Sequence, residues 1–266
     1  FGSALGTAGD VNNDGFSDLI VGSPNFTNGQ AGEGRAELFY GAGDPPSTTP
    51  GQTINGGQVQ PYYAWVTTSV GDVNGDGYSD VVASAPTGDY SLTDQGIVYL
   101  YGGSPGGLYY GLLWAGEQTG GNFGFSVAAA GDVNGDGYGD IIVGAPTTGA
   151  SGKAYVWLGG PSGPSAGAAN WSVSFGTAGA QFGTSVASAG DVNGDGYGDV
   201  IIGAPTDDNG QTDEGRAYVF LGSPTGLATT PVRIYEGDQD GAHLGNSVAS
   251  AGDVNRDGFS DVIVGA

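Results

Sequence analysis

Short apolar runs, each bounded by glycine and proline, recur along the whole chain. The most regular of them occupy residues 19–21, 81–83, 141–143, 200–202 and 262–264. They are rich in valine and isoleucine, and they are too short for a helix, so they predict β-strands. No interval between them shows the 3.6-residue period of an amphipathic helix. The pattern therefore predicts an all-β protein.

Further strand-like segments follow each of the first four runs. One set of segments comprises residues 37–40, 97–101, 154–158 and 217–221. A weaker set carries the aromatic residues Trp114, Trp171 and Tyr235. About four short strands in a period of about 60 residues are typical of a β-propeller blade. We therefore expect a β-propeller with four complete four-stranded blades and half of a fifth.

One motif, D-V-N-x-D-G-[FY]-x-D, marks each period. It starts at Asp10, Asp72, Asp132, Asp191 and Asp253. An aromatic residue or leucine precedes each start by nine positions, at Phe1, Tyr63, Phe123, Phe182 and Leu244. We divide the chain accordingly into repeats 1–62, 63–122, 123–181, 182–243 and a partial repeat 244–266, within a single propeller region 1–266.

The motif has the residue types of a calcium loop. Oxygen-bearing side chains occupy positions 1, 3, 5 and 9, and calcium takes six to eight oxygen ligands. Glycine at position 6 permits a sharp turn, position 7 offers its backbone carbonyl, and position 4 is free to vary because it does not ligate. The loop departs from an EF-hand, which has glutamate at position 12 and a following helix. Here a strand follows, so the Asp at position 9 must close the site.

We predict five calcium sites on this basis. Their ligands are Asp10, Asn12, Asp14, Phe16 and Asp18; Asp72, Asn74, Asp76, Tyr78 and Asp80; Asp132, Asn134, Asp136, Tyr138 and Asp140; Asp191, Asn193, Asp195, Tyr197 and Asp199; and Asp253, Asn255, Asp257, Phe259 and Asp261. A simple Asp-Gly hairpin turn would need neither three carboxylates nor their fivefold recurrence. Magnesium is a weaker alternative, because it prefers to keep its waters.

The charge of the chain excludes several classes of partner. With 5 Lys+Arg against 28 Asp+Glu among 266 residues, the formal net charge is −23. Such a chain will not bind nucleic acid or an anionic membrane surface unless metal ions reverse its sign locally. It has no cysteine, hence no disulfide or thiolate zinc site. No apolar stretch approaches 18 residues, so we expect no membrane insertion.

The string from Phe123-Gly124 through Asp132–Gly137 to Gly144-Ala145-Pro146 resembles an FG-GAP repeat. Such repeats form the propeller of the integrin α-subunit headpiece and occur in many bacterial extracellular proteins. The resemblance implies four-stranded blades with calcium in the hairpin between the first two strands. It also implies a seven-bladed ring, of which these residues would be an arc. The alternative is a compact ring with an incomplete fifth blade, or one that a partner chain completes. The second repeat departs from the pattern, with Tyr63-Ala64-Trp65 in place of Phe-Gly-x.

The resemblance further implies a non-enzymatic, calcium-stabilised extracellular module for adhesion. Its partner would be a protein or glycan ligand at the cell surface or in the matrix. Two alternatives stay open: a lectin-like, carbohydrate-binding propeller, and the non-catalytic propeller of a larger secreted enzyme.

Residues suited to catalysis are few and scattered. The single histidine, His243, corresponds to Tyr62, Asn122 and Gln181 in other repeats, which indicates a variable surface position. The five glutamates form no metal-binding or acid–base grouping. We interpret the loop acids as a solvated edge; these are Asp207, Asp208, Asp213, Asp238 and Asp240. We interpret three aromatic residues of the second repeat, Tyr109, Tyr110 and Trp114, as strand residues that seal neighbouring blades.

Overall fold

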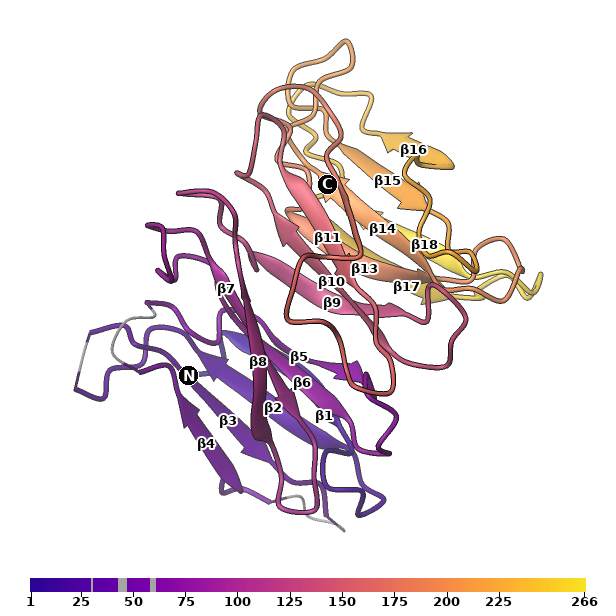
Figure 1. The fold of residues 1–266 in the computed structure, drawn as a ribbon. Coiled ribbons are helices and arrows are strands. Elements are labelled where there is room, and N and C mark those ends of the chain that lie inside the picture. Colours follow the sequence, from indigo (N-terminus) through magenta and orange to yellow (C-terminus); the bar gives the residue numbers. More distant parts are fainter. Residues whose placement is uncertain (30, 43–46, 58–60) are drawn as a thin grey trace. The chain divides into compact units, whose positions relative to one another are not determined.

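The computed structural model describes residues 1–29, 31–42, 47–57 and 61–266 (Figure 1). Every regular element of these described residues is a β-strand. Within the same residues, no helix is long and apolar enough to cross a membrane. The chain forms two compact units, Phe1–Phe125 and Ser126–Ala266.

The first unit holds two four-stranded sheets. Their strands follow one another in chain order, β1-β2-β3-β4 and β5-β6-β7-β8. All neighbours are antiparallel. The strands are β1 (Ala4–Gly9), β2 (Asp18–Ser23), β3 (Arg35–Phe39), β4 (Gln52–Asn55), β5 (Thr67–Gly71), β6 (Asp80–Ala85), β7 (Ile97–Gly102) and β8 (Tyr109–Ala115).

The second unit holds two further four-stranded sheets and one of two strands. The orders are β9-β10-β11-β12, β13-β14-β15-β16 and β17-β18. The strands are β9 (Ser126–Gly131), β10 (Asp140–Ala145), β11 (Lys153–Trp157), β12 (Trp171–Val173), β13 (Ser185–Gly190), β14 (Asp199–Ala204), β15 (Arg216–Phe220), β16 (Arg233–Glu236), β17 (Ser247–Gly252) and β18 (Asp261–Gly265). The prediction of four complete blades and half of a fifth is confirmed, and each sheet lies inside one predicted repeat. The arc of a seven-bladed ring stays a prediction.

Burial explains why the apolar runs are continuous rather than alternating. Every residue of β6, β10 and β14 is buried, so both faces of the second strand in these blades are covered. The outermost strand β16 is exposed throughout. A strand covered on both faces needs apolar side chains at successive positions. In these three blades the short valine and isoleucine runs are therefore the blade interiors, whereas Leu19 of β2 and Ile263 of β18 are exposed.

Aromatic side chains join two successive blades of the chain. In the second unit, the Trp171 ring of one blade meets the Phe220 ring of the next at 5.3 Å between centroids, edge to face. The indole nitrogen of Trp171 also donates to the Ala228 carbonyl at 3.0 Å. These contacts belong to a cluster that includes Val133, Phe182 and Leu227. Trp171 of β12 thus seals the third blade against the fourth.

The aromatic residue that opens each inner repeat is buried. Tyr63, Phe123 and Phe182 are 0–2% exposed. Tyr63, which departs from phenylalanine, donates its hydroxyl hydrogen bond to the Tyr101 hydroxyl at 2.8 Å, so its polar atom is satisfied inside the core. The residue that follows has φ of 63° at Ala64 and 91° at Gly183. Only the second repeat places a side chain in this left-handed conformation, which is strained for alanine and unstrained for glycine.

Candidate metal-binding loops

All five Asp-rich loops lie between the first and second strands of their sheets. Position 1 of the motif directly follows the first strand, and position 9 is the first residue of the second strand, as in β5 and β6 on either side of residues 72–79. The ladder shifts register there, between Ser69 and Gly71. The prediction that each loop sits in a β-hairpin is confirmed.

The position 1 carboxylate curls the loop around itself. In the second repeat, Asp72 Oδ1 accepts from the amides of Gly75 and Asp76 at 2.6 and 3.2 Å, and Oδ2 accepts from Gly77 at 2.8 Å. The same bonds form around Asp132 and Asp191. These hydrogen bonds from inward-pointing amides fix the turn and hold the side chain of the position 1 aspartate at the centre of the loop.

Positions 3 and 5 are tied to each other. The Asn74 side-chain amide donates to Asp76 Oδ2 at 2.9 Å, while Asn74 Oδ1 accepts from the Asp76 amide at 2.8 Å. Asp76 Oδ1 accepts from the Tyr78 amide at 3.0 Å. Both bonds between positions 3 and 5 recur in all five loops. The side chains at positions 1, 3 and 5 are therefore oriented by the loop backbone.

Two positions of each loop have a left-handed backbone conformation, with positive φ. Position 6 is always glycine, with φ between 88° and 91°. Position 4 is also left-handed in every loop, at Asn13 (54°), Gly75 (75°) and Arg256 (64°) among others. The expectation that position 4 is free to vary is wrong, since a side chain there is strained. Asparagine, which tolerates this conformation, and glycine account for four of the five loops.

Position 9 has a role that sequence reasoning missed. Asp18, Asp80, Asp140 and Asp199 are 0–1% exposed, and both oxygens of each carboxylate accept a backbone hydrogen bond. For Asp80 the donors are the Val73 amide at 2.9 Å and the Gly103 amide, after the third strand, at 2.9 Å. The glycine donors in the four complete blades are Gly41, Gly103, Gly159 and Gly222. In the sequence, the recurrence of a glycine just beyond each third strand is the signal from which this role of position 9 could have been predicted.

Burial governs the protonation of these aspartates. Desolvation raises the pKa of Asp80 to about 6, although the Gly103 and Val73 amides oppose the rise. Desolvation likewise raises the pKa of Asp140 to about 6, and the Gly159 and Val133 amides oppose the rise. A carboxylate that is costly to ionise in the protein interior gains from a cation beside it.

The residue types fit a hard cation. Each loop carries three carboxylates and one amide oxygen, and carboxylate oxygens that already accept one N–H retain a second lone pair. Across the described residues, no group of three or more Asp, Glu or His side chains is arranged as a metal site. The predicted ligand set, including the carbonyls of Phe16, Tyr78, Tyr138, Tyr197 and Phe259, stays a prediction.

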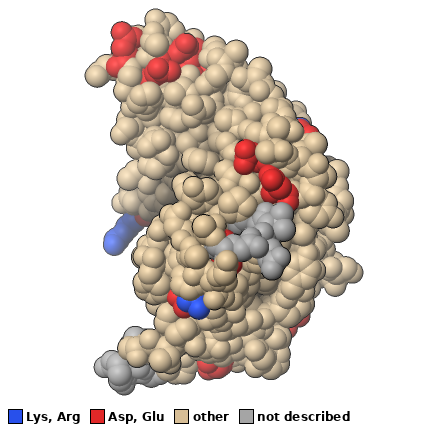
Figure 2. All heavy atoms as spheres, turned by 90° about the vertical axis from the view of Figure 1, so that its left-hand side faces the viewer, with Lys and Arg blue, Asp and Glu red and all other residues tan. Residues whose placement is uncertain are grey.

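Acidic residues also occur outside the loops, and one of them is buried rather than solvated. On the face drawn in Figure 2, patches of Asp and Glu are visible and Lys and Arg are sparse. Asp208, Asp238 and Asp240 are exposed, as expected for a solvated edge. Asp207, in contrast, is 0% exposed. The expectation of a solvated position is wrong for this residue.

Asp207 is the centre of a buried polar network. It accepts from the amide and hydroxyl of Thr177 at 2.7 and 2.9 Å and from the Tyr218 hydroxyl. The Arg216 guanidinium lies 3.5 Å from Asp207 and 3.3 Å from Glu236. A buried carboxylate is tolerated when it is paired and hydrogen-bonded in this way. The network is therefore structural.

The remaining candidates lie apart from one another. His243 is exposed, and its Nδ1 is 3.1 Å from the Pro205 carbonyl oxygen. Tyr109, Tyr110 and Trp114 all belong to β8, as expected; Trp114 is 3% exposed, whereas the two tyrosines are 48% and 57% exposed. The structure thus brings together the loop residues of each repeat, and among the described residues His243 belongs to no group of three or more side chains that could hold a metal ion.

Four-stranded antiparallel blades, joined in series and each opened by an Asp-rich hairpin loop, define a repeat propeller. The sequence matches the FG-GAP repeat family at residues 1–44, 64–101, 123–157 and 182–220. The chain belongs to the FG-GAP repeat family. The partial fifth repeat lies outside the matched segments.

Among curated relatives, integrin alpha-V of Gallus gallus is 34% identical over 213 residues, which is 77% of this chain and 20% of that protein. Integrin alpha-5 of Xenopus laevis is 42% identical over 90 residues, or 32% of this chain and 8% of that protein. The chain thus spans a fifth or less of these relatives. A solved structure, that of the exotype rhamnogalacturonan lyase YesX, is 12% identical with a TM-score of 0.46, and the match covers 98% of this chain and 56% of that chain.

Proposed function

We propose that this chain is a calcium-stabilised, extracellular and non-enzymatic propeller module that binds a macromolecular ligand. One observation carries the proposal: this chain of the FG-GAP family has five hairpin loops, and in each the backbone orients the oxygen-bearing side chains. The similarity to integrin α-subunits supports an adhesion-type role with a protein ligand.

In each loop, positions 1, 3, 5 and 9 and the carbonyl of position 7 would hold the cation. Calcium there would neutralise carboxylates that otherwise repel one another. Five ions would bring the formal charge from −23 to −13, since each ion adds two positive charges. Millimolar extracellular calcium is the concentration range that loops of this kind require. The ion would supply stability and leave the blade faces free for a partner.

A binding assay tests this function. The purified chain is immobilised and exposed to a panel of extracellular matrix proteins, once with millimolar calcium and once with excess chelator. We expect saturable binding to at least one matrix protein that weakens when calcium is removed. Absence of binding to every matrix protein, with a folded and calcium-loaded chain, would contradict the protein-ligand proposal.

A second candidate function, carbohydrate binding, is favoured by one pocket of the first unit. Tyr62, Trp65, Asn122 and Phe125 line a cavity of about 160 Å³ together with Pro86 and Thr87. Trp65 is 40% exposed, and its ring centroid lies 5.8 Å from that of Phe125 and 6.5 Å from that of Tyr62. Exposed aromatic faces beside an amide and a hydroxyl suit a neutral sugar ring.

A glycan array distinguishes this candidate from protein binding. If the pocket holds a sugar, Trp65→Ala removes glycan binding, whereas Tyr90→Ala leaves it unchanged. Tyr90 is a suitable control because it is 66% exposed and lies outside the pocket. Glycan binding that survives Trp65→Ala would exclude this pocket.

A further inference from the structure

The Asp-rich loops of successive blades are hydrogen-bonded to one another within each unit. We number the loops from one to five in chain order, as residues 10–18, 72–80, 132–140, 191–199 and 253–261. The position 8 amide of one loop donates to the position 1 carbonyl of the loop before it. These bonds run from Ser79 to Asp10 at 3.0 Å, from Gly198 to Asp132 at 2.8 Å, and from Ser260 to Asp191 at 2.8 Å. The same main-chain bond therefore joins every pair of successive loops inside a unit.

The donor amide belongs to the same peptide group as a predicted calcium ligand. In the fourth loop, the peptide group between Tyr197 and Gly198 contains the Tyr197 carbonyl, which is a predicted ligand, and the Gly198 amide, which donates to Asp132. A trans peptide group is planar, so its C=O and N–H point in opposite directions. The hydrogen bond to the third loop therefore fixes the direction of the Tyr197 carbonyl.

The acceptor carbonyl is connected in turn to a predicted ligand of the third loop. The peptide group that contains the Asp132 carbonyl also contains the Val133 amide, which donates to Asp140 Oδ2 at 2.7 Å. Two hydrogen bonds and two planar peptide groups thus connect the Tyr197 carbonyl with the Asp140 carboxylate. We call this connection the peptide relay. Equivalent relays run from Tyr78 to Asp18 and from Phe259 to Asp199.

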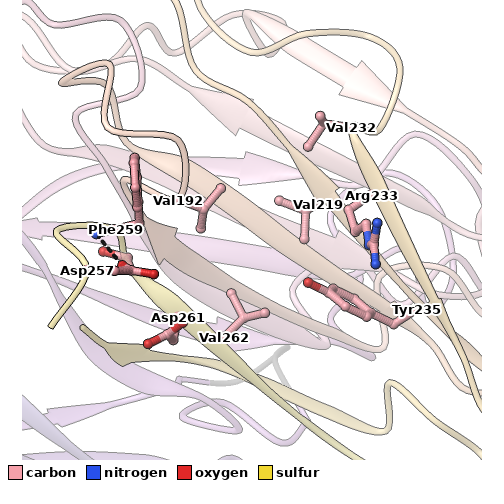
Figure 3. Close-up of a pocket in the computed structure, with 10 residues that line it drawn as sticks. Val192, Val219, Val232, Arg233, Tyr235, Asp257, Phe259, Asp261 and Val262 are labelled. Atoms are coloured by element: carbon pink, nitrogen blue, oxygen red, sulfur yellow. Dashed lines mark hydrogen bonds between the residues drawn. The ribbon is translucent and has the colours of Figure 1, made fainter. Parts of the chain in front are cut away.

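Aromatic side chains reinforce two of these junctions. The Tyr197 ring packs on Gly135, position 4 of the third loop, where an added Cβ would lie 2.6 Å from the ring. The Phe259 ring packs on Gly194 in the same way, also at 2.6 Å. Figure 3 shows Phe259 of the fifth loop together with Val192 of the fourth, and both line one pocket. Glycine at position 4 therefore leaves room for the ring of the next loop.

We propose that successive calcium sites within a unit are coupled, so that calcium in one loop raises the calcium affinity of its neighbour. The inference rests on the proposed calcium sites. Asp132 would be fixed when its carboxylate binds calcium in the third loop, and its carbonyl would then be a fixed acceptor for Gly198. The Tyr197 carbonyl is thereby oriented before the fourth loop is filled. The entropy of ordering is lost once for two sites, and linkage makes the effect reciprocal.

Repulsion between two bound cations opposes this coupling. The tips of the loops are exposed, so the repulsion acts largely through solvent and is screened by salt. The Debye length falls from about 8 Å at 0.15 M to about 3 Å at 1 M ionic strength. The peptide relay is made of short hydrogen bonds and is not screened in this way. Positive coupling should therefore be clearest in 1 M potassium chloride.

A calcium titration of the full chain, followed by NMR in 1 M potassium chloride, tests the proposal. The position 6 glycine amide donates to the position 1 carboxylate in every loop, so its signal reports on its own site. Asp136→Ala removes an exposed predicted ligand of the third loop and keeps the relay atoms. The Gly196 signal of the fourth loop should then require at least about fivefold more calcium. The control Asp238→Asn removes the same charge from an exposed position outside the loops and should leave the Gly196 titration unchanged.

Gly198→Pro tests whether the coupling runs through the relay. Proline has no amide hydrogen and cannot donate to Asp132. In the Gly198→Pro background, Asp136→Ala should no longer shift the Gly196 titration, and this double-mutant cycle isolates the relay. Circular dichroism checks that the proline variant is folded. The comparison of Asp136→Ala with Asp238→Asn decides on the coupling even if it is not.

The outcomes separate the coupling from the calcium sites themselves. If all five position 6 signals respond to calcium but Asp136→Ala leaves the Gly196 midpoint unchanged, the sites stand and the coupling is wrong. An equal shift in Asp238→Asn would also overturn the coupling, because the cause would then be the net charge. If no position 6 signal of the parent chain responds to millimolar calcium, the proposed calcium sites and the coupling are both wrong.

Discussion

The carboxylate of Asp80 accepts a hydrogen bond from the Gly103 amide at 2.9 Å, across 23 residues of sequence. Its other oxygen accepts from Val73, at the start of the Asp-rich loop. One buried side chain thus fastens the loop to the far end of the third strand. Because the same pair of bonds recurs in every complete blade, the loop geometry depends on the third strand as well as on the hairpin.

Asp80→Ala is expected to destabilise the protein more than Asp76→Ala does. Both substitutions remove a candidate ligand from the same loop, but only Asp80→Ala leaves two buried amides without an acceptor. At about 1–3 kcal/mol for each of the two unsatisfied groups, the difference should reach about 2–6 kcal/mol. Urea unfolding at fixed calcium measures both variants. Equal losses would show that Asp80 acts only through the metal.

Ala64→Gly is expected to stabilise the protein. Relief of the left-handed strain at φ 63° is worth about 1–2 kcal/mol, and the greater freedom of glycine in the unfolded chain offsets about 0.5–1 kcal/mol of it. A modest rise in melting temperature should result. The reverse change, Gly183→Ala, should destabilise by more than about 1 kcal/mol, because the new Cβ would also lie 2.6 Å from the Lys153 carbonyl oxygen. Opposite signs for the two variants are required.

Calcium removal is expected to lower the melting temperature. At dissociation constants of roughly 10⁻⁴–10⁻³ M, millimolar calcium contributes about 0.4–1.4 kcal/mol per site. Five sites could therefore supply several kcal/mol, a large part of the stability of a typical domain. Differential scanning calorimetry with calcium and with excess chelator makes the comparison. Identical melting curves would contradict both the metal sites and their stabilising role.

Asp136→Ala is expected to remove one calcium equivalent of five. The residue is exposed, and its loss leaves no buried group unsatisfied, so the other four loops should still be filled at a saturating calcium concentration. Equilibrium dialysis at millimolar calcium counts the bound ions. A parent chain that binds clearly fewer than five ions would show that some loops do not bind the metal, and the affected loop could then be located by the same substitution in each repeat.

Arg216→Met is expected to destabilise by about 3 kcal/mol, because it leaves the buried Asp207 carboxylate without its cation. Arg233→Met is the matched control: its guanidinium is exposed and lies 5.7 Å from the Tyr235 ring, so a loss below about 1 kcal/mol is expected. Chemical denaturation measures the two variants. If the double variant Arg216→Met/Asp207→Asn regains stability relative to Arg216→Met, the buried charge is the cause.

The repeated loop and the apolar runs could be read directly from the sequence, because both depend on local rules. Three oxygen side chains at alternate positions with glycine at position 6 specify a curled loop, whichever blade holds it. Runs such as residues 141–143 specify a strand covered on both faces. The four complete blades, the two-stranded fifth and the hairpin location of each loop follow from these patterns.

Other features were decided only by the tertiary structure, because they depend on what distant segments bring to one place. Asp207 has the sequence surroundings of a solvated acid, yet Thr177 and Arg216 enclose it. Position 9 looks like a metal ligand alone until Gly103 or its equivalent arrives from the end of the third strand. Local composition determined which elements form and which residues the loops carry. The packing of one blade on the next determined which of those polar groups are buried, and so which of them must be satisfied by the protein itself.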